Sequence, residues 1–170
     1  MKKIKVLFFF VLALGFNLCL SAQNMKIGYV DSADVMSVMP ERTKVEQDLQ
    51  VYYGELQTEL QAMATEYQNK MKDYEANVNT MSNLVRQSKE KEILDLQGRI
   101  QEFQNNAEVS FEEKRIELLT PVIEKIQNAV NAVGKEKGFT YVLDKSVGAV
   151  VYIGDDAIDI TPDVKSKLGL

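Results

Sequence analysis

The stretch Lys135–Asp144, KEKGFTYVLD, is the point where a long helical pattern gives way to strand-like sequence. Gly138 is a natural C-terminal stop for a helix, and the lysines before it complement the helix dipole. Two apolar runs, Phe139 to Leu143 and Ala149 to Ile153, are typical of strands joined through a turn. A pair of strands is only marginally stable in water, so the fold requires a further strand from elsewhere in the chain.

That strand is predicted at Met25 to Asp31, where apolar residues alternate. A short helical segment follows at Ser32–Met39 with Ser32 as N-cap, and the closing DITPDVKSKLGL predicts a last helix capped by Thr161. These pieces form a small β-rich body of residues 23–40 and 120–170. So small a core favours association of identical bodies. The residues expected to build this oligomerisation body are Ile27, Tyr29, Val30, Tyr141, Leu143, Val151, Ile153 and Ile160.

Between the parts of the body lie two long runs with helical periodicity. In the first, from Val45 to Met81, apolar residues recur every 3.6 residues on average, which is the period of a nearly straight α-helix. The second run repeats the pattern from Ile93 to Leu118 and is expected to continue past Pro121 to Gly134. Neither helix can bury its apolar stripe alone, so each requires a partner.

The two helices are predicted to pack against each other as an antiparallel hairpin. If the chain reverses at the polar cluster Asn77–Asn83, six apolar residues of the first stripe face apolar residues of the second. Lys89 and Lys114 are the exceptions, and Ser82 is the expected N-cap of the second helix. The predicted fold class is therefore α+β. It consists of a long antiparallel helical hairpin arm (41–119, tip near 77–83) that projects from a small β-rich oligomerisation body.

The first 22 residues have the layout of a cleaved signal peptide. A basic start is followed by an apolar run from Val6 to Phe16 and by small residues at Ser21 and Ala22. An uncleaved anchor is disfavoured because the run is short, and a lipid-modified Cys19 is disfavoured because no small residue directly precedes it. The sequence therefore predicts export to an extracytoplasmic compartment.

Composition limits the chemistry that the exported chain can perform. Without Lys2, Lys3 and Lys5 it has 17 basic and 25 acidic residues, a net charge of −8, and it has no cysteine or histidine. A negative chain argues against nucleic-acid binding. Phosphate-binding loops and nucleophile motifs are absent, and the aspartates of GDDAIDIT do not have calcium-loop spacing. We expect no enzyme activity, cofactor or metal, although composition alone leaves Ser/Lys catalysis open.

Some apolar residues of the predicted helices lie away from the hairpin seam. Tyr52, Met63, Tyr67 and Met71 are interpreted as seam residues, because a stripe at helical spacing is normally core. The apolar residues outside the seam either contact another molecule or are ordinary apolar residues scattered on the surface. The candidate residues for contact with a binding partner are Val51, Tyr53, Leu94, Val109 and Ile116.

The mature start KIGYVDS, the block KEKGFTYVLD and the tail DITPDVKSKL resemble the Skp/OmpH-like periplasmic chaperone family. The resemblance implies an obligate homotrimer in which the β-rich bodies associate and three arms surround a cavity. It also implies that unfolded outer-membrane β-barrel proteins are held there without ATP. The best-studied relatives are basic, whereas this chain is acidic, which argues against contact with membrane or lipopolysaccharide.

The sequence therefore predicts a periplasmic, ATP-independent holdase. The alternative is an envelope structural or adaptor protein whose coiled-coil arms grip one specific folded partner. One large apolar patch on the arm would favour the adaptor, whereas small apolar sites scattered along the arm would favour the holdase.

Overall fold

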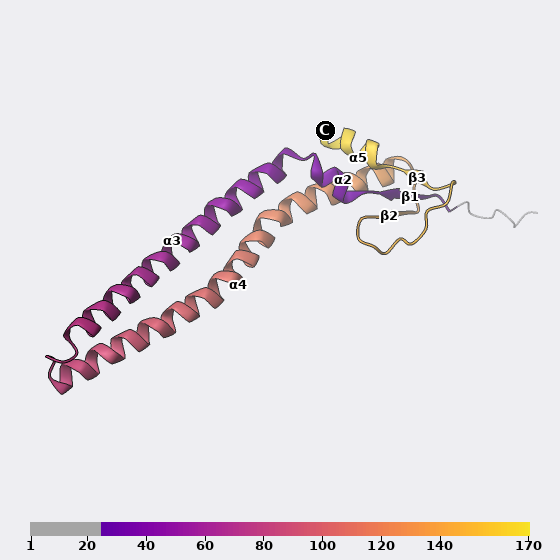
Figure 1. Ribbon diagram of the computed structural model, residues 1–170. Helices are drawn as coiled ribbons and strands as arrows, with labels where there is room; N and C mark the ends of the chain where they lie inside the picture. The colour runs from indigo at the N-terminus through magenta and orange to yellow at the C-terminus, as the bar shows by residue number, and fades with distance from the viewer. Residues whose placement is uncertain (1–24) are drawn as a thin grey trace, which may run out of the picture.

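A long helical hairpin projects from one end of a small body in the computed structural model, which describes residues 25–170 (Figure 1). The predicted signal peptide, residues 1–22 with Cys19, lies outside this range. The chain is α+β, as predicted. Its elements are β1 (Ile27–Val30), α2 (Ser32–Ser37), α3 (Pro40–Asn77), α4 (Asn83–Glu136), β2 (Tyr141–Asp144), β3 (Ile158–Asp159) and α5 (Thr161–Leu168).

The three strands form one sheet in the order β2-β1-β3, and both pairings are parallel. Ile27 lies beside Tyr141, and Tyr29 lies between Leu143 and Asp159. Parallel strands need a long crossover connection, and here the whole helical hairpin connects β1 to β2. The chain's first strand, β1, is therefore the central strand of the sheet and pairs with both β2 and β3.

The predicted pair of strands at Phe139–Leu143 and Ala149–Ile153 is only partly correct. The first strand begins at Tyr141, and the second run contains no strand. An alternating apolar run forms a strand only where a neighbour supplies hydrogen bonds, and both edges of β1 are already occupied by β2 and by Ile158–Asp159. Residues 149–153 therefore lie in the long loop between β2 and β3.

The predicted N-caps of α2 and α5 are wrong, whereas the predicted N-cap of α4 and the glycine predicted to end that helix are confirmed. The N-cap of α2 is Asp31, whose Oδ1 accepts a hydrogen bond from the backbone N–H of Asp34 at 2.9 Å. The N-cap position of α5 is Ile160, and the Thr161 hydroxyl instead accepts from the backbone N–H of Asp31. Ser82 caps α4 as predicted, and Gly138 follows that helix with a φ of +69°.

The body core forms where the last third of α4 meets α2, α5 and β1. α4 runs without a break through Pro121 into this core, and β1 contributes Val30. Its buried residues are Val30, Val35, Met39, Val45, Val122, Ile126, Ala129, Val130, Val133, Ile160 and Val164. One continuous helix therefore joins the arm to the body.

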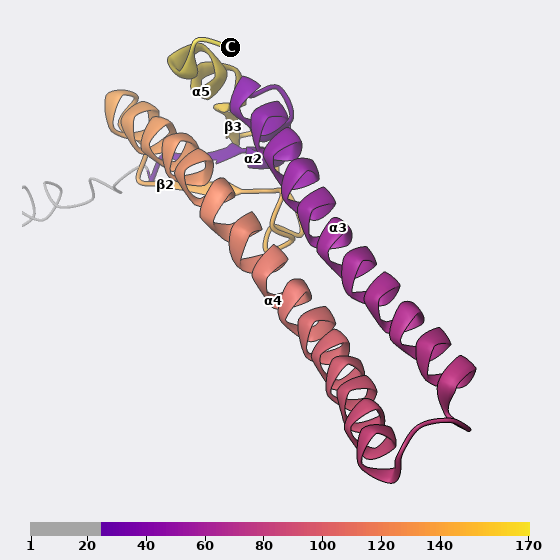
Figure 2. The same cartoon turned by 90° about the vertical axis from the view of Figure 1, so that its left-hand side faces the viewer.

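The arm is an antiparallel hairpin of α3 and α4, seen from two sides in Figures 1 and 2. The two lysines predicted as exceptions in the apolar seam both form ion pairs. Lys89 forms an ion pair with Asp73 at 3.1 Å, while Lys114 pairs with Glu117 on its own helix. A further ion pair between Lys70 and Glu92, at 3.0 Å, joins the two helices near the tip. Within residues 25–170, no helix is both long enough and apolar enough to cross a membrane.

Ile160→Ala is expected to lower the free energy of unfolding by about 3 kcal/mol, because Ile160 is fully buried and truncation leaves a cavity. Ile116→Ala serves as the control, since Ile116 is exposed on α4 and should change stability by less than about 0.5 kcal/mol. Chemical denaturation of both variants at one protein concentration tests this. Equal losses would show that Ile160 is not a core residue.

Candidate functional site

The described part of the chain offers surfaces rather than a catalytic constellation. Residues 25–170 contain no group of three potential metal-ligating side chains, and the sequence has no histidine to act as a base. In the GDDAIDIT segment, Asp159 accepts a hydrogen bond from the backbone N–H of Thr161 at 2.8 Å, while Asp155 and Asp156 are exposed. Asp159 therefore shapes the start of α5 and is not arranged with its neighbours as a metal site.

The five candidate contact residues on the arm are all exposed to solvent. Their exposed fractions run from 51% for Tyr53 to 64% for Leu94. Tyr53 packs edge-to-face against Phe111 across the hairpin, with ring centroids 5.9 Å apart, so Val51 and Tyr53 lie level with the segment of α4 that carries Val109 and Ile116. Leu94 is nearer the tip, at the level where the neighbouring Glu92 forms an ion pair with Lys70 of α3. The structure therefore brings four of the five residues to one level of the arm.

Grooves follow the seam between α3 and α4 at this same level. One groove of about 410 Å³ is lined by Tyr53, Leu56, Phe103 and Phe111 among others. The helices are loosely packed along this groove. None of the α3 residues between Val45 and Met63 is buried, although apolar residues recur there at regular helical spacing. The middle of the arm thus presents half-exposed apolar side chains to solvent.

Other exposed apolar positions on the helices were not singled out by the sequence reasoning. Leu84 and Val85 are exposed in the first turn of α4 at the tip, and Ile123 is exposed where α4 enters the body. The seven-residue spacing of Val109, Ile116 and Ile123 was a signal that could have identified Ile123. Exposed apolar side chains therefore extend from the tip to the root of the arm.

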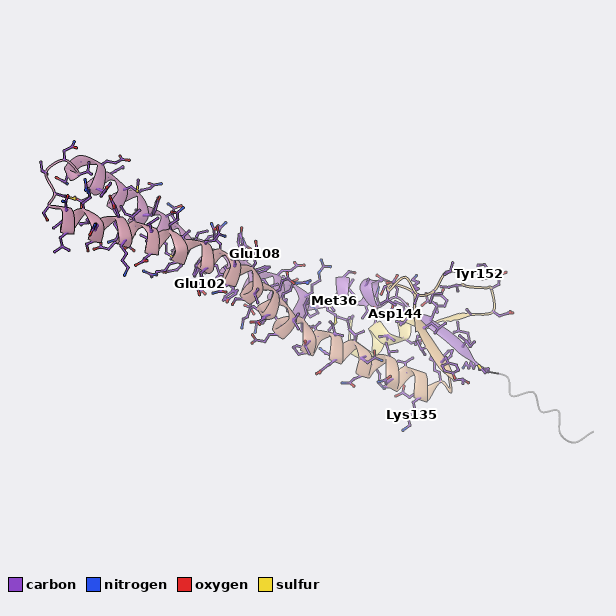
Figure 3. All side chains as sticks on the ribbon, turned by 90° about the horizontal axis from the view of Figure 1, so that it is seen from below. Met36, Glu102, Glu108, Lys135, Asp144 and Tyr152 are labelled. Atoms are coloured by element: carbon purple, nitrogen blue, oxygen red, sulfur yellow. The ribbon has the colours of Figure 1, made fainter. Side chains whose placement is uncertain are left out.

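The body has a second apolar surface, on the face of the sheet turned away from the helices. Val30 and Ile160 lie in the protomer's own core and are unavailable to another chain. Ile27, Tyr141 and Leu143 are exposed on the strands. In the loop after β2, Val151 is 97% exposed and Tyr152 is 84% exposed. Figure 3 shows Tyr152 at the end of the body away from the arm.

The remaining predicted body residues, Tyr29 and Ile153, are half-buried and line a groove of about 390 Å³ beside this face. Val147 and Ile158 add exposed apolar surface that the sequence reasoning did not select. The surface formed by Ile27, Tyr141 and Leu143 with Tyr152 of the following loop is called the open body face below.

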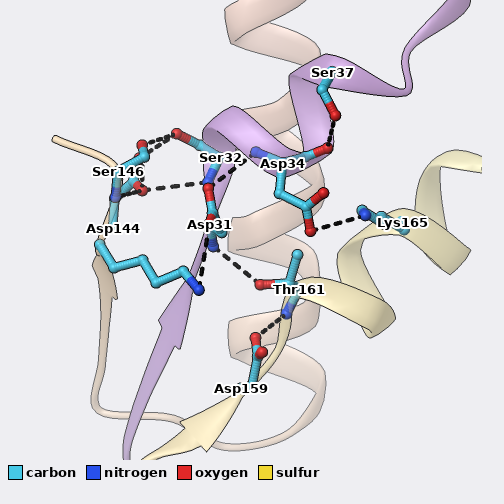
Figure 4. Close-up of polar contacts among 10 residues, drawn as sticks. Asp31, Ser32, Asp34, Ser37, Asp144, Ser146, Asp159, Thr161 and Lys165 are labelled. Carbon is cyan, nitrogen blue, oxygen red and sulfur yellow. Dashed lines mark hydrogen bonds and ion pairs between the residues drawn. The ribbon is translucent and has the colours of Figure 1, made fainter. Parts of the chain in front are cut away.

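A network of hydrogen bonds connects the ends of β1 and β2 to α2 (Figure 4). The Asp144 carboxylate accepts from the backbone N–H groups of Ser146 at 2.9 Å and Ser32 at 3.3 Å, and from both serine hydroxyls. Asp31 forms an ion pair with Lys145 at 3.3 Å. The sequence reasoning missed this network, although aspartates at the ends of two predicted strands were a usable signal.

The network lowers the pKa values of its carboxyl groups. Partial burial acts to raise the pKa of Asp144, but the hydrogen bonds from Ser32 and Ser146 outweigh it and hold this pKa below its usual value. The backbone N–H of Asp34, with a smaller effect of Lys145, lowers the pKa of Asp31. Both groups favour the folded state when ionised, so this stabilisation is present above about pH 4 and is lost as the pH falls through the folded-state pKa.

Asp144→Asn is expected to lower the free energy of unfolding at pH 7 by about 1–2 kcal/mol, through weaker hydrogen bonds to Ser32 and Ser146. The difference from the unsubstituted protein should shrink as the pH falls below about 4, because its Asp144 then becomes protonated. Denaturation at a series of pH values measures this. Asp155→Asn, at an exposed loop position, is the control. A difference that stays constant down to the acid transition would contradict the assignment.

Comparisons with known proteins agree with this architecture. The model of the family described as outer membrane protein (OmpH-like) matches residues 26–168. The chain is 28% identical over 146 residues to a protein named chaperone protein Skp from Pectobacterium atrosepticum, an alignment that covers 84% of this chain and 85% of that one. It is 29% identical over 158 residues to the protein of the same name from Yersinia enterocolitica, covering 92% and 94%.

The fold is also that of a solved structure. A putative outer membrane chaperone (OmpH-like) from Caulobacter crescentus superposes with a TM-score of 0.70 at 17% identity, over 84% of this chain and 82% of that one. The family match covers the hairpin and the body together, from just before β1 to the last residue of α5. The chain therefore belongs to the OmpH-like family.

Proposed function

We propose that this protein is an ATP-independent holdase chaperone of the periplasm, which binds unfolded outer-membrane β-barrel proteins in a cavity between the arms of a homotrimer. The observation that carries the proposal is the distribution of exposed apolar side chains along the whole arm, from Leu84 to Ile116. The relatives named chaperone protein Skp support the same function.

Several small contact sites are better suited to binding an unfolded client than to binding one folded partner. A folded partner is normally gripped at one large apolar patch, whereas an unfolded chain presents short apolar segments in no fixed arrangement. The exposed residues of the arm are separated by charged and amide side chains, and Leu94 lies apart from the group around Tyr53. This spacing supports the holdase over the adaptor, with Val51, Tyr53, Leu94, Val109 and Ile116 as contact residues.

The open body face supports the trimer. A body of residues 23–40 and 120–170 has few buried side chains, and additional apolar burial would stabilise it. The loop run Ala149–Ile153 has strand-like sequence but is not paired with any strand of the described residues, and β2 has a free edge in the sheet. In the proposed trimer, this loop and the open body face pack against neighbouring bodies, which leaves the arm of residues 41–119 projecting outward.

The proposed location follows from the predicted signal peptide at residues 1–22, whose removal would leave an acidic chain. A binding cycle based on many weak contacts needs no nucleotide. Binding of membrane or lipopolysaccharide is not part of the proposal, because the exported chain has a net charge of −8.

The proposed assembly can be tested through the mass of the protein in solution. Light scattering on the purified protein should give a trimer mass, and Tyr152→Asp combined with Leu143→Asp should shift the mass to that of the monomer, because charge would be buried in the interface. Leu84→Asp at the tip, where the side chain is exposed and far from the body, should keep the trimer mass. A monomer of normal stability before any substitution would contradict the proposed assembly.

The proposed client holding can be tested through the suppression of aggregation. The purified protein should suppress aggregation of a urea-diluted outer-membrane β-barrel protein at one trimer per client. The triple substitution Val51→Ser, Val109→Ser and Ile116→Ser should raise the concentration needed for half-suppression about threefold to tenfold, because apolar contact area is lost.

The matched control replaces exposed polar residues of the same arm with serine, at Gln68, Gln97 and Asn106. Serine differs little in helix propensity from the residues that it replaces in either variant, so a difference between the variants reports lost apolar contacts. No suppression of aggregation by the unsubstituted protein would refute the holdase function, and equal effects of the two triple substitutions would refute the assigned contact residues.

A further inference from the structure

Charge is distributed unevenly along the arm. The segments 45–69 and 100–113, which we call the acidic band, contain five and four acidic residues respectively and no lysine or arginine. The segment 70–99, which includes the tip, contains six basic and five acidic residues. The negative charge of the arm is therefore concentrated in its middle, on both helices.

Most of these carboxylates have no cation beside them in the folded chain. Glu46, Glu66 and Glu112 pair with basic residues just outside the band, namely Arg42, Lys70 and Arg115. Within residues 25–170, the other six band carboxylates form no ion pair. They are Asp48, Glu55, Glu59, Glu102, Glu108 and Glu113, all exposed. The charge of the band is thus available to an external partner.

A groove in the hairpin seam lies at the level of the acidic band. The groove of about 410 Å³ lies here and is lined by Glu108 and several amide side chains. We call it the mid-arm groove, and its apolar walls are Tyr53, Leu56, Leu60, Phe103, Ala107 and Phe111.

A second hollow extends this groove toward the tip, and the two share Gln57, Leu60 and Gln104. A side chain at Gly54, which lines that hollow, would meet no atom within 4 Å, so the space beside the glycine is open. Figure 3 shows Glu102 and Glu108 on α4 in the middle of the arm.

We propose that the mid-arm groove binds unfolded polypeptide segments in which lysine or arginine lies beside aromatic or aliphatic side chains. The apolar side chains of such a segment would enter the groove. Its cations would lie near Glu108 in the groove wall and be attracted by the exposed carboxylates Glu55, Glu59 and Glu102 on neighbouring turns of the two helices. This inference rests on the proposed holdase function and specifies which part of a client the arm selects.

Charge complementarity favours this occupant over the alternatives. An acidic segment would be repelled by the six band carboxylates that form no ion pair within residues 25–170. A second copy of the arm would place two acidic bands together, which is unfavourable for the same reason. A cationic segment gains electrostatic attraction without a rigid geometry, which suits a disordered client and allows rapid release.

The test compares two labelled unstructured peptides of equal length and equal apolar content, one with arginines where the other has glutamates. Fluorescence anisotropy with the full protein should show that the cationic peptide binds about tenfold tighter at low ionic strength. The preference should shrink as salt is added, because exposed charges are screened. Equal affinities for the two peptides would overturn the proposal.

Two variants with equal net charge locate the effect. The substitutions Glu55→Gln, Glu59→Gln, Glu102→Gln and Glu108→Gln should reduce the preference to less than about twofold. The control neutralises four exposed acids outside the band through Glu75→Gln, Asp95→Asn, Glu124→Gln and Asp155→Asn, and should retain the preference. An equal loss in both variants would show that only overall charge matters, and this too would overturn the proposal.

A third variant, Tyr53→Ser, tests the apolar part of the site, because Tyr53 is an exposed wall of the groove. It should weaken both peptides by a similar factor and leave the mass in light scattering unchanged. A changed mass would identify the groove as a contact between copies and would contradict the proposal.

The aggregation assay separates this inference from the proposed function. Suppression without any cationic preference would refute only the inference. No suppression, together with a clear cationic preference, would refute only the holdase function.

Discussion

The last third of α4 is the constraint on which the rest of the molecule depends. This one helix begins at the tip of the arm, passes through Pro121 and ends in the centre of the body core, where Val122, Ile126 and Val130 are buried. Proline within a helix usually weakens the hydrogen-bond ladder, but packing around Val122 holds the helix in one piece. A continuous helix fixes the direction of the arm relative to the body, which two helices joined by a loop would not do.

The same helix explains why the sheet is parallel and small. The chain leaves β1, travels the length of the arm twice and returns through α4 before it forms β2, so the hairpin acts as one long crossover. Helices cover one face of the resulting three strands, while Ile27, Tyr141 and Leu143 remain exposed on the other face. An uncovered apolar sheet face on so small a body is the physical reason to expect association between copies.

The sequence predicted the hairpin well because periodicity is a local property. The 3.6-residue stripe and the polar reversal at residues 77–83 located both helices, and Ser82 and Gly138 marked two of their ends. The strands were harder to predict, because Ala149–Ile153 has strand-like composition but β1 was already paired on both sides. The N-cap predictions for Ser32 and Thr161 were wrong for a related reason. Ser32 is hydrogen-bonded to Asp144 and Thr161 to Asp31, and both partners are far away in the sequence.

The candidate surfaces were likewise only partly predictable. Distance from the seam stripe correctly identified Val51, Tyr53, Leu94, Val109 and Ile116 as exposed. A regular stripe does not reveal how tightly it is packed, however, so the half-exposed stretch from Leu49 to Leu60 became visible only in the structure. That stretch is loose because the hairpin is fastened at its two ends, by the body core at the root and by Met63, Ile93 and Leu96 toward the tip. The exposed ion pairs Lys70–Glu92 and Lys89–Asp73 add little to this fastening. An arm held firmly at both ends can keep apolar side chains accessible in the middle without losing its shape, and the proposed binding of unfolded chains requires this combination.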